Sequence, residues 1–136
     1  MKLSEYADTI VRTIAPNYSP PITKPQVEMF HAALGLATEA GELLDNWKKA
    51  IFYGGRVFDT VNADEEMGDL MWYMMLYCKA RAEQERCEPD EMFQRIMAGN
   101  TAKLRARYPG KFETQHAEQR DTDAEIAAMQ RAMRAE

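Results

Sequence analysis

Apolar residues recur along this chain at helical spacing, in segments that prolines and glycines separate. Residues 4–15 carry one apolar stripe, and Pro16 ends it. After a predicted loop over residues 17–22, the sequence Thr23-Lys24-Pro25-Gln26 has the form of a capping box, in which Thr and Gln satisfy free amide groups at a helix start. We therefore expect one helix before Pro16 and a second from about Lys24 to about Ala50.

A third helix is predicted from Asp59 or Asn62 to about Arg86. Its centre, residues 70–78, is apolar on every side, which is typical of a helix that is buried all round. A single chain of 136 residues can hardly cover such a helix. We therefore expect an oligomer, a homodimer or homotetramer, with this helix at its centre.

The remaining pattern predicts a fourth helix and a separate tail. The fourth helix opens at Glu88-Pro89-Asp90 and closes at Tyr108-Pro109-Gly110. The chain is polar from Glu113, and residues 121–136 then show apolar positions at helical spacing, which we expect to form a peripheral or partly disordered helix. No strand pattern persists, so the sequence predicts an all-α fold.

Composition narrows the classes of function. The formal net charge of −5 argues against a nucleic acid polymer as partner, because binding to its phosphates needs clustered Lys and Arg. The N-terminus carries no apolar signal core, and no apolar run reaches the length of a membrane span. A cytoplasmic protein without a membrane partner is the expectation that follows.

Two pairs of carboxylates carry the candidate chemistry. Glu39 and Glu42 form one pair and Glu66 and Asp69 the other, and a spacing of three residues places both members of a pair on one helix face. Two such helices side by side would form a nest of four acids, which needs a positive partner if it is buried. The alternative is that all four are solvated on exposed helix faces.

The residue types indicate which metal would fit this nest. Neither pair contains His or Cys, which softer metals prefer, and ligation by oxygen alone favours Mg²⁺, with Mn²⁺ as the alternative. Mg²⁺ in proteins commonly binds substrate phosphates as well as carboxylates. The sequence therefore favours a substrate that carries phosphate.

A polar stripe on the fourth helix could hold such phosphates. Asn100, Lys103 and Arg107 lie at positions i, i+3 and i+7 of one helix face. Taken alone, they are more typical of a solvated basic patch near a helix C-terminus. Beside an acidic metal site they become candidate ligands for phosphate oxygens that the metal does not reach.

Four residues of the second helix have two interpretations each. Lys48 and Lys49 could add to phosphate binding, although exposed lysines at a helix end are the more frequent case. Trp47 could stack on a base or pack in the core. His31 could contact a base or satisfy a hydrogen bond inside the protein.

These residues together resemble a known family. The order Glu39-x-x-Glu42, then residues 43–65, then Glu66-x-x-Asp69 is similar to the signature of the MazG-like, all-α nucleoside triphosphate pyrophosphohydrolases. A further element of many members is similar to Asn100-x-x-Lys103-Leu104-x-x-Arg107-Tyr108-Pro109. The resemblance spans residues 27–112, within a predicted domain of residues 1–112 that precedes the tail of residues 113–136. Many members carry another Glu where this chain has Thr38.

The resemblance implies a fold of four-helix-bundle type in an oligomer and a Mg²⁺-dependent enzyme. Such enzymes cleave a nucleoside triphosphate to the monophosphate and pyrophosphate. The implied roles are metal binding by the four acids of the two pairs, proton acceptance by Glu39 or Glu65, stabilisation of pyrophosphate by Lys103 and Arg107, and orientation of the substrate by Asn100.

Two other interpretations of the sequence stay open. One is a helical assembly module without enzymatic activity, in which the acids are solvated. The other is a related enzyme, such as a phosphoribosyl-ATP pyrophosphohydrolase or a dUTP or dCTP pyrophosphohydrolase, because base recognition depends on pocket shape and a few contacts.

Overall fold

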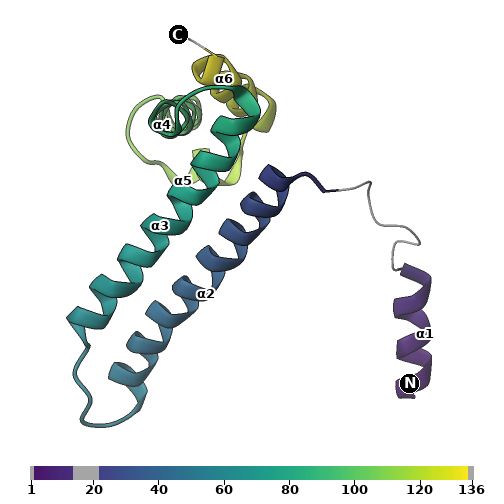
Figure 1. The fold of residues 1–136 in the computed structure, drawn as a ribbon, viewed down its shortest axis with the longest axis vertical. Helices are drawn as coiled ribbons and strands as arrows, with labels where there is room; N and C mark the ends of the chain where they lie inside the picture. Colours follow the sequence, from purple (N-terminus) through teal and green to yellow (C-terminus); the bar gives the residue numbers. More distant parts are fainter. Residues whose placement is uncertain (1, 14–21, 135–136) are drawn as a thin grey trace.

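Most of the chain that the structure describes is folded into α-helices. The structure is a computed structural model that describes residues 2–13 and 22–134, and it contains no strand over those residues, so the predicted all-α class is confirmed. The helices are α1 (Leu3–Thr13), α2 (Lys24–Phe52), α3 (Thr60–Glu85), α4 (Pro89–Arg107), α5 (Thr114–Glu118) and α6 (Thr122–Arg134), as shown in Figure 1.

Local capping sets the starts of the long helices. The main-chain N–H of Thr23 donates to the Gln26 side chain over 2.8 Å, and the Thr23 hydroxyl accepts from the Gln26 main chain, so both halves of the predicted capping box are present. Asp59 caps α3 by accepting from the main-chain N–H groups of Val61 and Asn62. Of the two predicted starts of the third helix, the one at Asp59 is therefore confirmed.

α2 and α3 form a long antiparallel pair, joined by the loop of residues 53–59 (Figure 1). Ala32 of α2 and Ala63 of α3 are both buried. A Cβ at Gly35 would lie 2.2 Å from Cε1 of Tyr73, so glycine at this position is what lets the Tyr73 ring lie against α2. Ala32 and Gly35 therefore allow the two helices to approach closely over the half of α2 that precedes the acidic residues, and Ala63 is a small buried residue toward the loop end of the pair.

α4 turns across the C-terminal part of α3 and is seen almost end-on in Figure 1. The core at this crossing is formed by Cys78 and Ala82 of α3 and Met92 of α4, with Cys87, Phe93 and Ile96 packed against it. One chain thus forms a helical pair with a third helix across it. A four-helix bundle stays a prediction for an assembly of chains.

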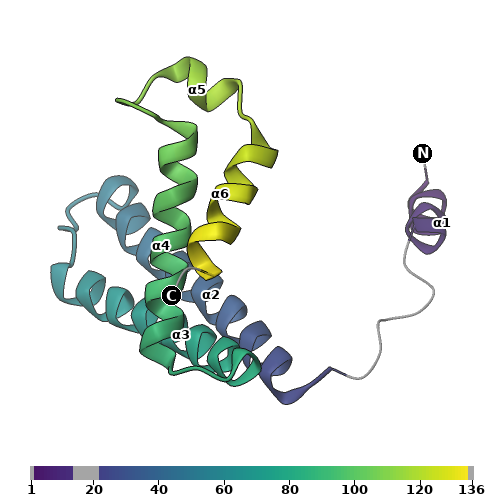
Figure 2. The same ribbon diagram turned by 90° about the horizontal axis from the view of Figure 1, so that it is seen from above.

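α6 packs side by side with α4, as both views show (Figure 2). A Cβ at Gly99 of α4 would lie 2.6 Å from Cγ of Met133, so the absence of a side chain at Gly99 makes room for α6. Glu125 of α6 is only 2% exposed. The predicted tail therefore contains a helix that is packed against α4 over its length.

The observed helices differ from the predicted helices in two places. α2 runs two residues beyond the expected end at Ala50, and the short helix α5 falls in a segment for which the sequence pattern predicted no element. The predicted stop at Pro16 and the loop over residues 17–22 lie, except for Ile22, outside the described residues. α1 lies apart from the other described helices.

The middle of α3 is not covered within a single chain. Met71 and Trp72 are 55% and 57% exposed, and Phe30 of α2 is 64% exposed. A surface with several large exposed apolar residues is typical of one that another chain covers. None of the described helices combines the length and the apolar character that a membrane crossing requires.

Candidate metal centre

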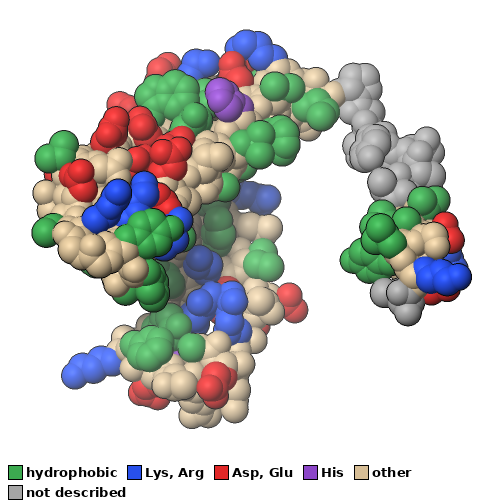
Figure 3. Space-filling model, turned by 90° about the horizontal axis from the view of Figure 1, so that it is seen from below, with side chains coloured by type: hydrophobic (Ala, Val, Ile, Leu, Met, Phe, Trp, Pro, Cys, Tyr) green, Lys and Arg blue, Asp and Glu red, His purple; other side chains and the backbone are tan. Residues whose placement is uncertain are grey.

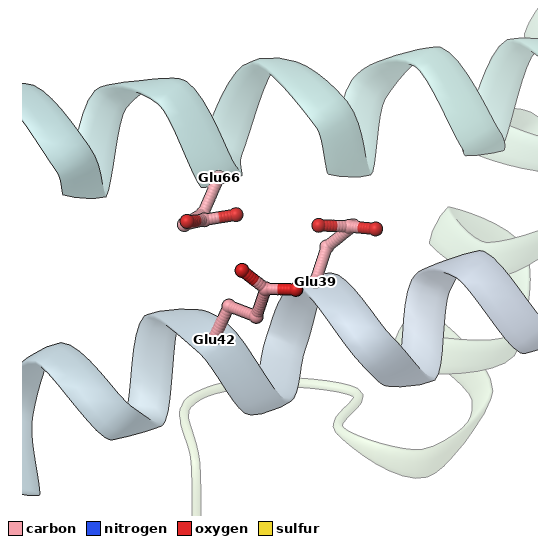
Figure 4. A group of neighbouring side chains, drawn as sticks. All are labelled: Glu39, Glu42 and Glu66. Atoms are coloured by element: carbon pink, nitrogen blue, oxygen red, sulfur yellow. The ribbon is translucent and has the colours of Figure 1, made fainter.

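Three glutamates from two helices converge on one point between α2 and α3. Glu39 and Glu42 extend from α2 and Glu66 extends from α3 into the space between the helices (Figure 4). One carboxylate oxygen of each residue lies within 4.8 Å of the others. Glu66 is 4% exposed, whereas Glu42 is exposed and Glu39 is intermediate. The cluster therefore has a buried base and an open side.

The buried carboxylate is held in place by its own helix. The side-chain amide of Asn62 donates a hydrogen bond of 2.8 Å to Oε1 of Glu66. Asn62 lies one turn earlier, where i and i+4 side chains meet. On α2, Oγ1 of Thr38 lies 3.2 Å from Oε1 of Glu39. A neutral donor thus orients Glu66, whereas the single hydroxyl proton of Thr38 also has the nearer carbonyl oxygen of Gly35, at 2.9 Å, as an acceptor.

The donor set fits a hard divalent cation. Three carboxylates this close repel one another unless a positive charge lies between them. No salt bridge between described residues reaches any of the three glutamates. Oxygen ligands only, with an open side for water or phosphate, are what Mg²⁺ and Mn²⁺ prefer.

Two other predicted site residues lie near this cluster on α3 but outside it. Asp69 comes one turn after Glu66 and is exposed. Glu65 is also exposed, on the neighbouring face of the helix. The structure therefore brings together three of the four acids of the two pairs, and Asp69 does not belong to the converging group.

A cavity of about 450 Å³ lies next to the cluster, at the loop end of the α2–α3 pair. Lys49 and Arg56 line it together with Asn62, the residue that holds Glu66. Figure 3 shows acidic and basic side chains gathered side by side on this face of the molecule. A cavity that contains two cations and lies beside an acidic cluster can accommodate a phosphate chain that a metal binds from one side.

Buried Asn46 fixes the loop that borders this cavity. Its side-chain amide donates to the carbonyl of Asp59 over 2.7 Å, and its oxygen accepts from the Asp59 main-chain N–H over 3.1 Å. Asn46 is only 6% exposed. This pair of bonds connects the end of α2 to the start of α3, and so sets the register that aligns Glu66 with the acids of α2.

The sequence pattern did not predict Asn46, Asn62 and Arg56 as site residues. The position of Asn62 four residues before Glu66 was a usable signal, because i and i+4 side chains meet on a helix. Arg56 follows two glycines in the loop, and this position was a weaker indication that it belongs to the site. Nothing in the sequence alone marks Asn46, because its partner is the main chain of a residue thirteen positions away.

The other predicted residues of α2 have defined partners. Lys48 and Lys49 both donate to Asp45, and these contacts lower the pKa of Asp45 to about 2. The Trp47 ring stacks on Phe58 with ring centres 4.1 Å apart. The rings of His31 and Tyr73 of α3 meet edge to face, with ring centres 5.7 Å apart. Only Lys49 of this set lines the cavity beside the acids.

Within one chain the polar stripe of α4 is not brought to the acids. α4 contacts the C-terminal part of α3 through Met92, Phe93 and Ile96. At a rise of about 1.5 Å per residue, Arg107 lies roughly 16 Å beyond Ile96 along α4. Asn100 and Lys103 lie between them, and none of the three lines the cavity beside the acids.

Arg107 is instead paired with the C-terminal helix. Its Nε and a terminal guanidinium nitrogen donate to the two carboxylate oxygens of Glu125 over 3.0 and 2.7 Å. Arg120 donates to the same carboxylate over 3.2 and 2.8 Å. These two guanidinium groups lower the pKa of Glu125 to about 2. In a single chain, Arg107 therefore joins α4 to α6.

Comparison with known proteins identifies one related family. The sequence model of the MazG nucleotide pyrophosphohydrolase domain matches residues 31–112. The match covers more than half of the chain and contains all three converging glutamates, Asp69 and the polar stripe of α4. No curated protein and no solved structure gives a significant match.

Proposed function

The chain belongs to the MazG nucleotide pyrophosphohydrolase domain family, and from this premise we propose that it hydrolyses nucleoside triphosphates to nucleoside monophosphates and pyrophosphate with Mg²⁺. The observation that carries the proposal is the convergence of Glu39, Glu42 and Glu66 within 4.8 Å. A cluster of this kind, with no basic partner among the described residues, destabilises the fold unless a cation lies between the carboxylates. The same repulsion makes the cluster a good binding site for a cation.

Each acidic residue has a proposed role. Glu39, Glu42 and Glu66 would hold Mg²⁺, with Mn²⁺ as the alternative ion, and Asp69, one turn after Glu66 on α3, would complete the ligand set by turning its side chain toward the converging group. The chemistry that such an ion supplies when bound is neutralisation of phosphate charge and a lower pKa for a water ligand. Glu39 or Glu65 would accept the proton of the attacking water, Glu39 as a member of the converging group and Glu65 as the residue that precedes Glu66 on α3.

The cations next to the cluster are the best placed to bind phosphate within one chain. Lys49 and Arg56 line the cavity that begins beside Asn62. Their charges would stabilise the leaving pyrophosphate, on which negative charge develops as the bond breaks. Lys48 lies beside them on α2, where its Nζ is 6.0 Å from the centre of the Tyr53 ring.

We further propose that the active protein is a homodimer or a homotetramer. The exposed apolar residues of α2 and α3, Met71, Trp72 and Phe30 among them, would be covered by a second copy. Asn100 and Lys103 retain their implied role as phosphate ligands only in an assembly that brings α4 to the acids of another copy. In the same assembly His31 and Trp47 of α2 would border the base.

Pyrophosphate release from a panel of standard and modified nucleoside triphosphates in the presence of Mg²⁺ tests the activity and its base preference. Glu42→Gln and Asp69→Asn keep the size of each side chain and remove a charge, so both should abolish hydrolysis and leave the helical circular dichroism spectrum intact. Glu118→Gln makes the same change in α5 and should retain activity. Full activity of Glu42→Gln would refute the metal role.

The exposed apolar surface also favours a second candidate, a helical assembly module without enzymatic activity. The two candidates differ in their response to ligands. An enzyme that binds Mg²⁺ and nucleotide in its native state is stabilised by both against thermal unfolding, whereas an inert module is not. A phosphoribosyl-ATP or a dUTP or dCTP pyrophosphohydrolase would be recognised by the preferred nucleotide in the same panel.

A further inference from the structure

A second cavity lies where the ends of three helices meet, far from the acidic cluster. Its volume is about 450 Å³, and Arg81 of α3, Arg95 of α4 and Arg134 of α6 line it. We call this cavity the arginine pocket. Arg81 is fifteen residues beyond Glu66 on the same helix, which at about 1.5 Å per residue separates them by roughly 22 Å.

The charge at the rim of the arginine pocket is unbalanced. Three arginines and a single acid, Glu85, are the charged residues that line it. Arg81 donates to Glu85 over 2.8 Å, and Arg95 pairs with Glu91, which lies outside the lining. Among the described residues, Arg134 takes part in no salt bridge. The rim therefore has an excess of positive charge.

The ion pairs of Arg81 and Arg95 can be replaced by contacts to a ligand with little loss of stability. Both join residues four apart on one helix, and the arginines are 27% and 30% exposed. Exposed pairs of this type contribute little to the free energy of unfolding. A guanidinium group binds phosphate through two parallel hydrogen bonds, which are stronger than such a pair. A phosphate group could thus replace a carboxylate partner of these arginines.

The floor of the arginine pocket is apolar. Met92 is only 1% exposed and belongs to the core, and Met133 packs against α4 at Gly99. Methionine adapts its shape to flat or irregular partners and contacts aromatic rings favourably. A volume of about 450 Å³ is within the range of sites for small organic ligands. The combination suits a ligand with an aromatic ring and at least two negative charges.

We propose that the arginine pocket binds a nucleoside phosphate without a metal ion, at a site separate from the acidic cluster. Phosphate oxygens lie between Arg95 and Arg134, with Arg81 as a third donor, and the base rests on Met92 and Met133. Because three helices contribute to the pocket, an occupied site joins α6 to the α3–α4 crossing. The proposal does not depend on the hydrolytic function of the acidic cluster.

Calorimetric titration of the full chain with ADP in the presence of EDTA tests this proposal. Chelation removes divalent ions from the acidic cluster, so the expected result is metal-independent binding of one ADP per chain. Inorganic pyrophosphate should bind more weakly, because it has no ring to contact the methionines. Absence of ADP binding would overturn the proposal, and equal affinity for pyrophosphate would overturn the role of the apolar floor.

Matched variants assign the binding to these arginines. Arg95→Gln and Arg134→Gln should each weaken ADP binding by about tenfold or more, since each loses a charged hydrogen bond. Glu91→Gln breaks the same ion pair as Arg95→Gln but leaves Arg95 in place, so it should bind ADP at least as tightly as the parent chain. Equal weakening by Glu91→Gln and Arg95→Gln would show that only helix stability was changed.

Two further variants separate this site from the candidate metal centre. Arg105→Gln removes an arginine of α4 that does not line the pocket, and it should leave ADP affinity unchanged. Glu42→Gln, in the acidic cluster, should likewise leave metal-free ADP binding unchanged while it abolishes hydrolysis. A loss of metal-free binding in Glu42→Gln would place the nucleotide at the acidic cluster and overturn the separate site.

Discussion

The side-chain amide of Asn62 donates a hydrogen bond of 2.8 Å to the buried carboxylate of Glu66. Glu66 is the only one of the three converging glutamates that is almost fully removed from solvent. A buried carboxylate that is held by a neutral donor keeps its orientation, and its remaining lone pairs are available to a metal ion. This is the arrangement in which residues that contact a metal ligand tune the affinity of the site.

Substitution of Asn62 should therefore weaken metal binding while the fold is retained. We expect Asn62→Ala to lower the affinity for Mg²⁺ or Mn²⁺ by about tenfold to a hundredfold, because Glu66 loses the donor that orients it. Calorimetric titration with Mn²⁺ in the absence of nucleotide measures this. Asn100→Ala makes the same change on α4 and should leave metal affinity as it was. Equal affinity in both variants would contradict a role for Asn62 at the metal centre.

Because the Asn46 side chain bonds the main chain of Asp59, we expect a substitution of Asn46 to lower the stability of the fold rather than to remove a catalytic group. Asn46→Ala leaves the carbonyl and the N–H of Asp59 without their partner, and such a loss costs about 1–3 kcal/mol in the free energy of unfolding. Asn46→Asp retains the acceptor but loses the donor, and it places a buried negative charge against the carbonyl oxygen of Asp59, so its loss should be at least as large. Urea denaturation measures both variants. No change in either would mean that water replaces the Asn46 side chain without cost.

Two glycines of α2 should respond in opposite ways to the same substitution. Gly35→Ala places a Cβ 2.2 Å from the Tyr73 ring, so the ring or the helix must move, which costs about 1–3 kcal/mol. Gly41→Ala meets no atom within 4 Å and should stabilise the helix by about 0.5–1 kcal/mol. Thermal unfolding of the two variants checks this, and similar melting temperatures would contradict the close approach at Gly35.

The pairing of Glu125 with two arginines predicts a defined dependence of stability on pH. The pKa of Glu125 is about 2 in the folded chain against an ordinary value of 4.5. A carboxyl group whose pKa is lowered by folding stabilises the fold fully above its unfolded pKa, and this contribution is lost as the pH falls toward the folded value. The arginines stay charged over this whole range.

Glu125→Gln should therefore be less stable than the parent chain at neutral pH, and the difference should shrink between pH 4.5 and about pH 2. Denaturant unfolding at a series of pH values measures this difference. Asp45 also has a pKa of about 2, but it is present in both proteins, so its contribution cancels. A difference that is independent of pH would contradict the pairing of Glu125 with Arg107 and Arg120.

The starts of the helices were predictable because they depend on neighbouring residues. The box of Thr23 and Gln26, the cap at Asp59 and the proline at the start of α4 each act within one helical turn. The facing acids were predictable in part for the same reason, since the spacing of three residues fixes which side chains share a helix face. α5 could not be predicted from such signals, because neither an apolar stripe nor a side-chain cap marks it.

The amino-acid sequence by itself determined the helical class, the limits of the long helices and the pairs of acids that share a face, because all of these follow from interactions within a few residues. Tertiary structure alone decided which acids converge, that Asn46 fixes the loop before α3 and that Arg107 pairs with Glu125. Those outcomes depend on how segments distant in the chain pack against each other, and small differences in the position of one helix decide which partner a side chain finds.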